Sequence, residues 1–137
     1  MDGHKSLKVY QLAYKLKMEI YEISKSFPSE ERYSLTDQIR RSSRSVAANI
    51  AEGYRKRQYP NAFANKMSDA DGEATETQVW LDVAKDCLYI NAYTHLRLIA
   101  DYKQVGNMLG HMMNNPNKFK PRVGLPTASA SRQHVDD

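Results

Sequence analysis

The sequence predicts an all-α protein, an antiparallel up-and-down four-helix bundle with a flexible C-terminal tail. Four segments repeat apolar residues at steps of three and four, which is the period of one helix face. Short connections join these segments, and short connections favour antiparallel neighbours in a bundle. No segment shows the alternation of apolar and polar residues that marks a half-buried strand. The bundle is expected to occupy residues 1–115, and the flexible basic tail residues 116–137.

The first predicted helix spans residues 7–27. Proline lacks the amide hydrogen and disfavours helical backbone in the residue before it, so Pro28 ends this helix. Its apolar stripe consists of Val9, Leu12, Leu16, Ile20, Ile23 and Phe27.

The second predicted helix begins at Ser34 and ends near Gly53. Ser34 followed by Asp37 resembles a capping box, and the freedom of glycine at positive φ suits a helix end. At 100° per residue, its core stripe consists of Leu35, Ile39, Val46 and Ile50. The opposite face has the small residues Ala48 and Ala51 in its middle. The arginines of that face are Arg40, Arg41, Arg44 and Arg55.

The third predicted helix has Pro60 in its first turn, a position that proline tolerates. Its core stripe consists of Phe63, Met67, Ala70, Ala74, Thr77, Leu81, Ala84 and Leu88. Its second half carries another apolar stripe, made of Val79, Trp80, Val83 and Cys87. A helix that is apolar over most of its circumference must be buried on two sides.

The fourth predicted helix is capped by Asn91 and ends at the sequence NNPN, residues 114–117. Its core stripe consists of Leu98, Tyr102, Val105, Leu109 and Met112. After Pro116 the composition shifts to Lys, Pro, Ser, Thr and Gly, which is typical of a flexible tail.

The additional apolar surfaces of the second and third helices predict a subunit interface. Each helix of a four-helix monomer has a solvent side, so a second buried face requires another chain. The alternative is that Trp80 merely covers the edge of the bundle. The residues expected at the interface are Ala48, Ala51, Val79, Trp80 and Val83.

Charge is unevenly distributed along the chain, although the net charge is only +4. Residues 34–57 contain six Lys or Arg residues against two Asp or Glu residues. Residues 60–90 show the reverse, with two Lys residues against six Asp or Glu residues. This pattern leaves two interpretations open: complementary charges on packed neighbours, or an anionic partner for the basic helix.

The sequence contains no apolar run near the ~20 residues that a membrane-spanning helix needs, and its start has no apolar stretch behind its charges. A soluble, cytoplasmic protein is therefore expected. Cys87 is the single cysteine, which excludes an internal disulfide and a cysteine-rich metal site.

No catalytic, metal or cofactor site is expected. A ferritin-like metal site needs Glu-x-x-His pairs, which the sequence lacks, and His95 and His111 fall on opposite faces of their helix. Cys87 lies in an apolar stripe, where a buried thiol is usually inert. Four polar residues on or beside buried stripes are expected to hydrogen-bond between the second and third helices rather than to bind a ligand: Asn49, Glu52, Thr77 and Gln78.

Two segments of the sequence resemble a known family. SLTDQIRRSSRSVAANIAEGYRKR contains Q-I-R-R followed by N-I-A-E-G, and DGEATETQVWLDVAKDCLYI contains E-T-Q-V-W-L-D. In order and spacing over residues 5–113, they resemble the four-helix-bundle proteins first noticed as products of intervening sequences in bacterial 23S ribosomal RNA genes. Many members carry proline where this chain has Ala47, so this helix should run straighter.

The resemblance implies a left-handed antiparallel bundle that assembles as a homopentamer. The family is also similar to the accessory variability proteins of diversity-generating retroelements, which are basic pentamers that bind nucleic acid and a reverse transcriptase. Its molecular function is not established, so the resemblance supplies signature positions and no catalytic residues. These positions are Arg40, Arg41, Asn49, Glu52, Gly53, Glu76, Thr77 and Gln78.

We therefore expect a non-enzymatic, oligomeric protein that binds structured RNA, with ribosomal RNA the favoured partner. The planar fork of arginine meets phosphate oxygens through two hydrogen bonds, which suits this role. The residues expected to contact phosphates are Arg40, Arg41, Arg44, Arg55, Lys56 and Arg57, with Lys118, Lys120 and Arg122 of the tail adding affinity.

Two alternatives stay open at this point. In one, the protein is a scaffold whose basic rim docks an acidic partner protein such as a reverse transcriptase. In the other, the arginines pair with the acidic residues of the third helix, an arrangement that contributes little stability when it is exposed.

Overall fold

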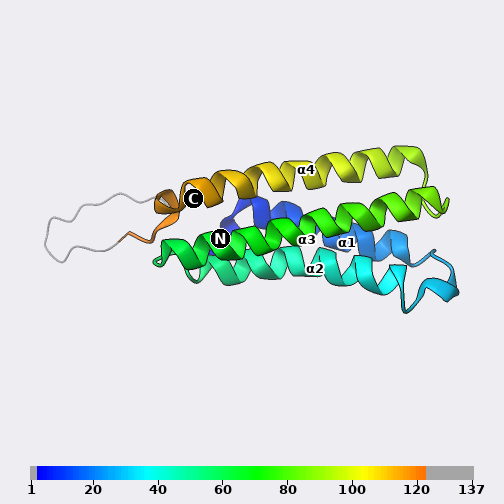
Figure 1. Cartoon of the computed structure of the whole chain (residues 1–137), viewed down its shortest axis with the longest axis horizontal. Coiled ribbons are helices and arrows are strands. Elements are labelled where there is room, and N and C mark those ends of the chain that lie inside the picture. The colour runs from blue at the N-terminus through cyan, green and yellow to red at the C-terminus, as the bar shows by residue number, and fades with distance from the viewer. Residues whose placement is uncertain (1–2, 123–137) are drawn as a thin grey trace, which may run out of the picture.

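The computed structural model describes residues 3–122, which form four long helices. These are α1 (Lys8–Ser24), α2 (Leu35–Tyr54), α3 (Pro60–Asp86) and α4 (Ala92–Asn114). Three short 3₁₀ helices accompany them: η1 (Gly3–Ser6), η2 (Ser29–Glu31) and η3 (Pro116–Phe119). The long helices alternate in direction (Figure 1), and each packs against the next while α1 packs against α4. The predicted all-α antiparallel four-helix bundle is confirmed.

The core of the bundle is built from the predicted apolar stripes. All the stripe residues predicted for α2 and α4 are buried, and so are those of α3 as far as Ala84. In α1, Leu12 and Ile23 are only half-buried, because Ala13 takes a place in the core instead. α2 is continuous through Ala47, which is itself buried.

The predicted stripe of α3 is wrong at its last position. The helix ends at Asp86, and Leu88 adopts a left-handed φ of 65° with 88% of its surface exposed. The N–H of Leu88 bonds to the carbonyl of Lys85 and that of Tyr89 to the carbonyl of Ala84, a Schellman motif that usually has glycine at the left-handed position. Cys87, just before this turn, is exposed, so the expected buried thiol is also wrong.

The start of α2 differs from the predicted capping box. The Ser34 hydroxyl donates to Oε1 of Glu31 at 2.7 Å, and the Leu35 N–H donates to the same oxygen at 3.2 Å. Glu31 therefore caps the helix in place of Ser34 and Asp37. Its other oxygen accepts a hydrogen bond from the Tyr89 hydroxyl, which ties this connection to the α3–α4 turn and raises the pKa of Tyr89 to about 12. The same hydrogen bonds, led by that of Ser34, lower the pKa of Glu31.

The prediction that Gly53 ends α2 with a positive φ is wrong. The helix continues to Tyr54, and the φ of Gly53 is not positive. Its role is a close approach between α2 and α3. A Cβ atom at this position would lie 2.3 Å from Cε of Met67 and 2.9 Å from Cβ of Lys66. Only glycine lets the two backbones pack at this distance.

The predicted tail begins on the bundle itself. Phe119 of η3 stacks on Phe63 of α3, with 5.6 Å between the ring centres. Residues 116–119 therefore pack against α3 and α4. Residues 123–137, the rest of the predicted tail, lie outside the described residues. Across residues 3–122, none of the helices combines the length and the apolar character needed to cross a membrane.

Candidate nucleic-acid interface

One end of the bundle gathers three basic segments that are far apart in the sequence. They are the N-terminal residues 3–8, the α2–α3 turn at 54–60 and the C-terminal residues 116–122 (Figure 1). None of the three contains Asp or Glu. We call this surface the basic end, and its cations are Lys5, Lys8, Arg55, Lys56, Arg57, Lys118, Lys120 and Arg122.

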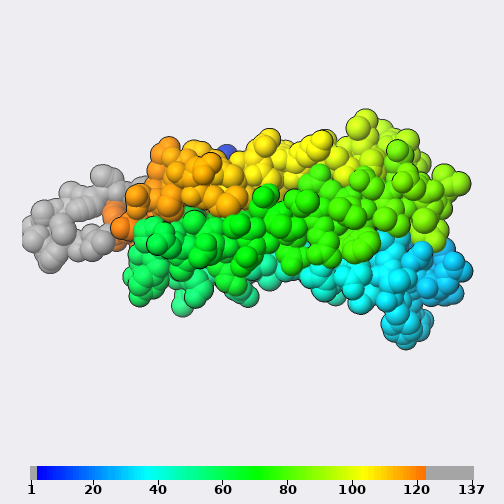
Figure 2. Space-filling view, in the orientation of Figure 1, coloured from blue at the N-terminus to red at the C-terminus, as the bar shows by residue number. Residues whose placement is uncertain are grey.

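The three segments lie beside one another, because they line shared pockets at this end of the bundle. Pro121 lines a small pocket with Tyr54, Arg55, Arg57 and Gln58 of the α2–α3 turn. Phe119 and residues 6–9 of the N-terminal part line the same apolar groove. Figure 2 shows the residues of η3, in orange, lying against the start of α3, in green.

The side chains of the α2–α3 turn differ in how firmly they are held. The Arg57 guanidinium stacks over the Tyr54 ring at 3.8 Å, and its Nε donates to the Tyr54 carbonyl at 2.9 Å. Arg55 and Lys56 are exposed and form no ion pair with another described residue. The turn thus presents one fixed cation and two that are available to an anionic partner.

The opposite end of the bundle has a different charge. Its two connections, residues 25–34 and 86–91, contain Lys25 and Arg32 against Glu30, Glu31 and Asp86. The positive charge of the basic end thus exceeds the net charge of the whole chain, which is +4. Of the segments that form the two ends of the bundle, those of the basic end alone carry an excess of positive charge.

The arginines that the sequence placed on one face of α2 have different partners in the structure. Arg40 turns toward α1, where its Nε donates to the Ser24 hydroxyl at 2.7 Å and its guanidinium stacks on the Tyr21 ring. Arg44 is exposed, with its guanidinium 5.9 Å from the same ring. Arg41 turns the other way, toward α3. The predicted set of six cations thus falls into two groups: Arg40, Arg41 and Arg44 line one groove on α2 together with Arg32, and the other three lie in the α2–α3 turn.

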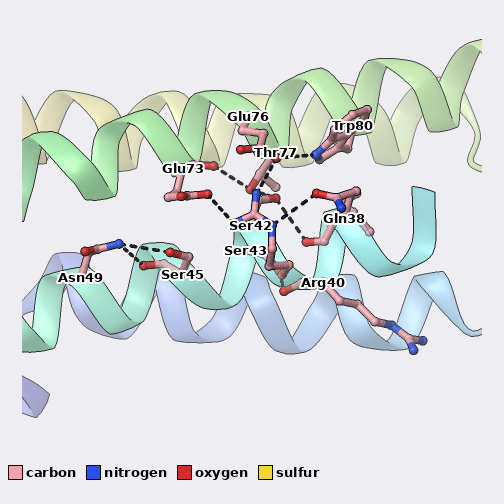
Figure 3. A network of polar contacts seen from close by, with 12 residues as sticks. Gln38, Arg40, Ser42, Ser43, Ser45, Asn49, Glu73, Glu76, Thr77 and Trp80 are labelled. Atoms are coloured by element: carbon pink, nitrogen blue, oxygen red, sulfur yellow. Dashed lines mark hydrogen bonds and ion pairs between the residues drawn. The ribbon is translucent and has the colours of Figure 1, made fainter. Parts of the chain in front are cut away.

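Arg41 is the centre of a polar network between α2 and α3. Its Nη1 donates to Glu73 at 3.2 Å and its Nη2 to Glu76 at 2.5 Å. Glu76 also accepts a hydrogen bond from Nε1 of Trp80 at 3.0 Å, and Gln38 accepts one from Nε of Arg41. Figure 3 shows Glu73, Glu76 and Trp80 on α3, with Gln38 on the neighbouring helix α2. At Arg41, the interpretation that arginines pair with the acids of the third helix is the right one.

This network predicts a pH-dependent contribution to stability. Arg41 lowers the pKa of Glu76 below its ordinary 4.5, so the stabilisation is present above that pH and is lost as pH falls through the lowered value. We expect Arg41→Gln to lower the free energy of unfolding by about 1 kcal/mol at pH 7, since the pair is partly exposed. The difference from the unmodified protein should shrink at pH 3, measured by urea unfolding. Arg44→Gln is the control, and an equal loss at both pH values would contradict the prediction.

The signature residues mainly join α2 to α3. The hydroxyls of Ser42 and Thr77, both buried, are hydrogen-bonded at 2.8 Å. Lys66 donates to Glu52 at 2.6 Å and to Asn49 at 3.4 Å. The expected hydrogen bonding between the second and third helices is thus present for Thr77, Glu52 and Asn49. Gln78 differs, because its side chain donates to the Ala74 carbonyl within α3.

The predicted interface residues lie at two places on the surface. Ala48 is exposed and lines a groove of about 570 Å³ on α2 together with Arg44 and Ser45, while Ala51 is half-buried. On α3, Val79 has 49% of its surface exposed, and Trp80 and Val83 are half-buried against the core. In the single chain, Val79 and Ala48 are therefore accessible.

The two histidines of α4 are accounted for by contacts within the chain. His95 lies 2.7 Å from a carboxylate oxygen of Asp82, and His111 packs edge-on against Phe119. Among residues 3–122, no three His, Cys, Asp or Glu side chains are grouped closely enough to hold a metal ion.

The fold and the site together define an α-helical bundle protein with a single cationic end. Comparison with known proteins places it more narrowly. The chain belongs to the 23S rRNA-intervening sequence protein family, whose model matches residues 5–111.

A solved structure similar to this one is described as a protein of unknown function from the S23 ribosomal protein family of Bacteroides thetaiotaomicron. It is 26% identical, with a TM-score of 0.70, and the match covers 77% of this chain and 95% of that one. No curated protein matches the chain.

Lys5 and Lys8 are the members of the basic end that the sequence reasoning missed. The signal was present in the predicted topology. In an up-and-down bundle, the start of the first helix, the second connection and the end of the fourth helix all meet at one end. Counting charge by bundle end, and not by continuous segment, would have found these two lysines.

Proposed function

We propose that the protein is a non-enzymatic, cytoplasmic RNA-binding protein that holds the phosphates of structured RNA, ribosomal RNA in particular, at its basic end. The observation that carries the proposal is the convergence of eight Lys and Arg residues, without an acid, from the three segments of the basic end. The description of the family names 23S rRNA, which favours ribosomal RNA as the partner.

Charge and shape, and not base sequence, govern recognition in this proposal. Lysine and arginine contact phosphates, which position a protein on nucleic acid without reading its bases. A-form RNA exposes its phosphates and 2′-hydroxyls more readily than its base edges. Arg41 is excluded from the binding set because it is engaged by Glu73 and Glu76, and Arg40 because it is engaged by α1.

We also propose that the protein assembles as a homo-oligomer, a pentamer by the family resemblance. The exposed Val79 and the half-buried Trp80 and Val83 on α3 supply an apolar surface for a neighbouring chain, and Ala48 and Ala51 supply a small-sided face of α2. Several chains packed in the same direction in an oligomer would have their basic ends side by side, and together they would engage more phosphates than one chain.

The test is size-exclusion chromatography with light scattering, run on the protein alone and with a structured ribosomal RNA fragment at 50 and 200 mM salt. We expect a pentamer-sized species that shifts with RNA at low salt. If six phosphates are engaged, affinity should fall by about 10³-fold between the two salt concentrations. An affinity that does not change with salt would overturn the RNA proposal, and a monomer would overturn the assembly. A pentamer indifferent to RNA would favour a scaffold that docks an acidic partner protein.

A further inference from the structure

A stripe of aromatic and basic side chains runs along the outside of α1. Tyr10, Tyr14, Lys17 and Tyr21 are spaced by four, three and four residues, which places them on one face of the helix. We call this stripe the aromatic track. It starts next to the basic end, because Lys5 of η1 lines a groove of about 500 Å³ with Tyr10, Gln11 and Tyr14.

The first two rings of the track are close together, and the second is exposed. The centres of Tyr10 and Tyr14 are 6.0 Å apart, and 45% of the surface of Tyr14 is exposed. Tyr10 is half-buried, and His4 packs edge-on against it at 4.7 Å. An exposed tyrosine on the outer face of a bundle helix contributes little to the core. Packing within the bundle therefore does not explain the presence of an aromatic residue at Tyr14.

Each part of the track carries a cation. The ammonium of Lys17 lies 3.7 Å from the centre of the Tyr14 ring. At the far end, Tyr21 is approached by Lys25 at 4.9 Å, Arg40 at 4.7 Å and Arg44 at 5.9 Å. From Tyr10 to Tyr21 the helix rises roughly 16 Å, about the length of five stacked bases. Alternating rings and cations over such a distance are typical of surfaces that bind single-stranded nucleic acid.

We propose that an unpaired stretch of the bound RNA leaves the basic end and follows the aromatic track, with bases stacking on Tyr10 and Tyr14 and phosphates contacting Lys5, Lys17 and Arg44. Bases stack on tyrosine rings whatever their identity, so the track adds affinity for unpaired RNA without selecting a sequence. This inference rests on the proposed RNA binding, and it adds that the RNA carries single-stranded nucleotides beside its folded part.

The test compares two RNA probes by fluorescence anisotropy: a fluorescent 12-nucleotide single strand without secondary structure, and a 12-base-pair duplex. We expect Tyr14→Ala to weaken binding of the single strand by about 10-fold and to leave duplex binding unchanged. The salt dependence of binding should stay the same, because every phosphate contact is kept. Tyr14→Phe keeps the ring and should bind like the unmodified protein.

The matched control is Tyr93→Ala, which removes a tyrosine that is 72% exposed at the opposite end of the bundle. It should change neither affinity. The proposed role of the aromatic track would be overturned if Tyr14→Ala weakened binding of the single strand and the duplex equally, or if it did not weaken binding of the single strand. If the unmodified protein bound neither probe nor the ribosomal fragment, the proposed function itself would fail. That result differs from one in which the unmodified protein binds RNA and Tyr14→Ala leaves its affinity unchanged.

Discussion

Reversing three charges at the basic end is expected to weaken RNA binding by a factor on the order of 10², because three attractive interactions with phosphates become repulsive. The variant is Arg55→Glu, Lys56→Glu and Lys120→Glu, three exposed positions outside the packed core. The slope of log affinity against log salt should also become shallower by roughly 3, since each phosphate that is no longer neutralised lowers the slope by about 0.9. Both quantities follow from anisotropy titrations with the ribosomal fragment at several salt concentrations.

A second triple variant separates position from net charge. Arg32→Glu, Lys85→Glu and Lys103→Glu remove the same charge at exposed positions outside both the basic end and the aromatic track. This control should reduce affinity only slightly, because salt screens charges that lie far from the bound RNA. Equal effects of the two triples would show that net charge and not the basic end governs binding. No effect of either would exclude phosphate binding at the basic end.

Substituting Gly53 is expected to have the largest effect on stability among the signature positions. Gly53→Ala places a Cβ atom 2.9 Å from Cβ of Lys66, an atom fixed to the α3 backbone, and 2.3 Å from Cε of Met67. The Met67 side chain can rotate away, but Lys66 yields only if α2 and α3 move apart. We expect a loss of about 2 kcal/mol in the free energy of unfolding, measured by urea denaturation, because such overpacking outweighs the better helix propensity of alanine.

Gly72→Ala is the matched control for this prediction. Gly72 also lies within a helix, and a Cβ atom built there meets nothing within 4 Å. Alanine should stabilise this position by about 0.5 to 1 kcal/mol. If Gly53→Ala were stabilising to the same extent, the close approach of α2 and α3 would be refuted.

The helices and most of the core could be predicted from the sequence because periodicity reports burial directly. In α4, the five predicted stripe residues are all buried, and Asn91 caps the helix by accepting a hydrogen bond from the N–H of Thr94 at 2.8 Å. The end of α3 could not be predicted in this way. The spacing of Leu88 is that of a core residue, whereas the structure places it in a left-handed turn where a glycine is usual.

The candidate site was harder to predict than the fold, because charge has no periodicity that reveals its partner. Arg40, Arg41 and Arg44 look alike in the sequence, yet their partners differ. Arg40 stacks on Tyr21, and Arg41 pairs with two glutamates. The Arg44 guanidinium lies 5.9 Å from the Tyr21 ring. Their directions depend on which neighbouring helix offers an acceptor. The basic end depends on the topology of the bundle, which the sequence predicts correctly. Finding it from the sequence requires adding the charges of the terminal segments to that topology.

The position of the only cysteine makes the protein convenient for site-specific labelling. Cys87 is exposed in the α3–α4 turn, whereas the basic end begins at the other end of the 27-residue helix α3. At 1.5 Å per residue, the two are about 40 Å apart. A maleimide dye at Cys87 is thus well separated from the RNA held at the basic end and within energy-transfer range of a dye on that RNA. A tag at Gly3, by contrast, would crowd the binding surface, because the N-terminal segment belongs to the basic end.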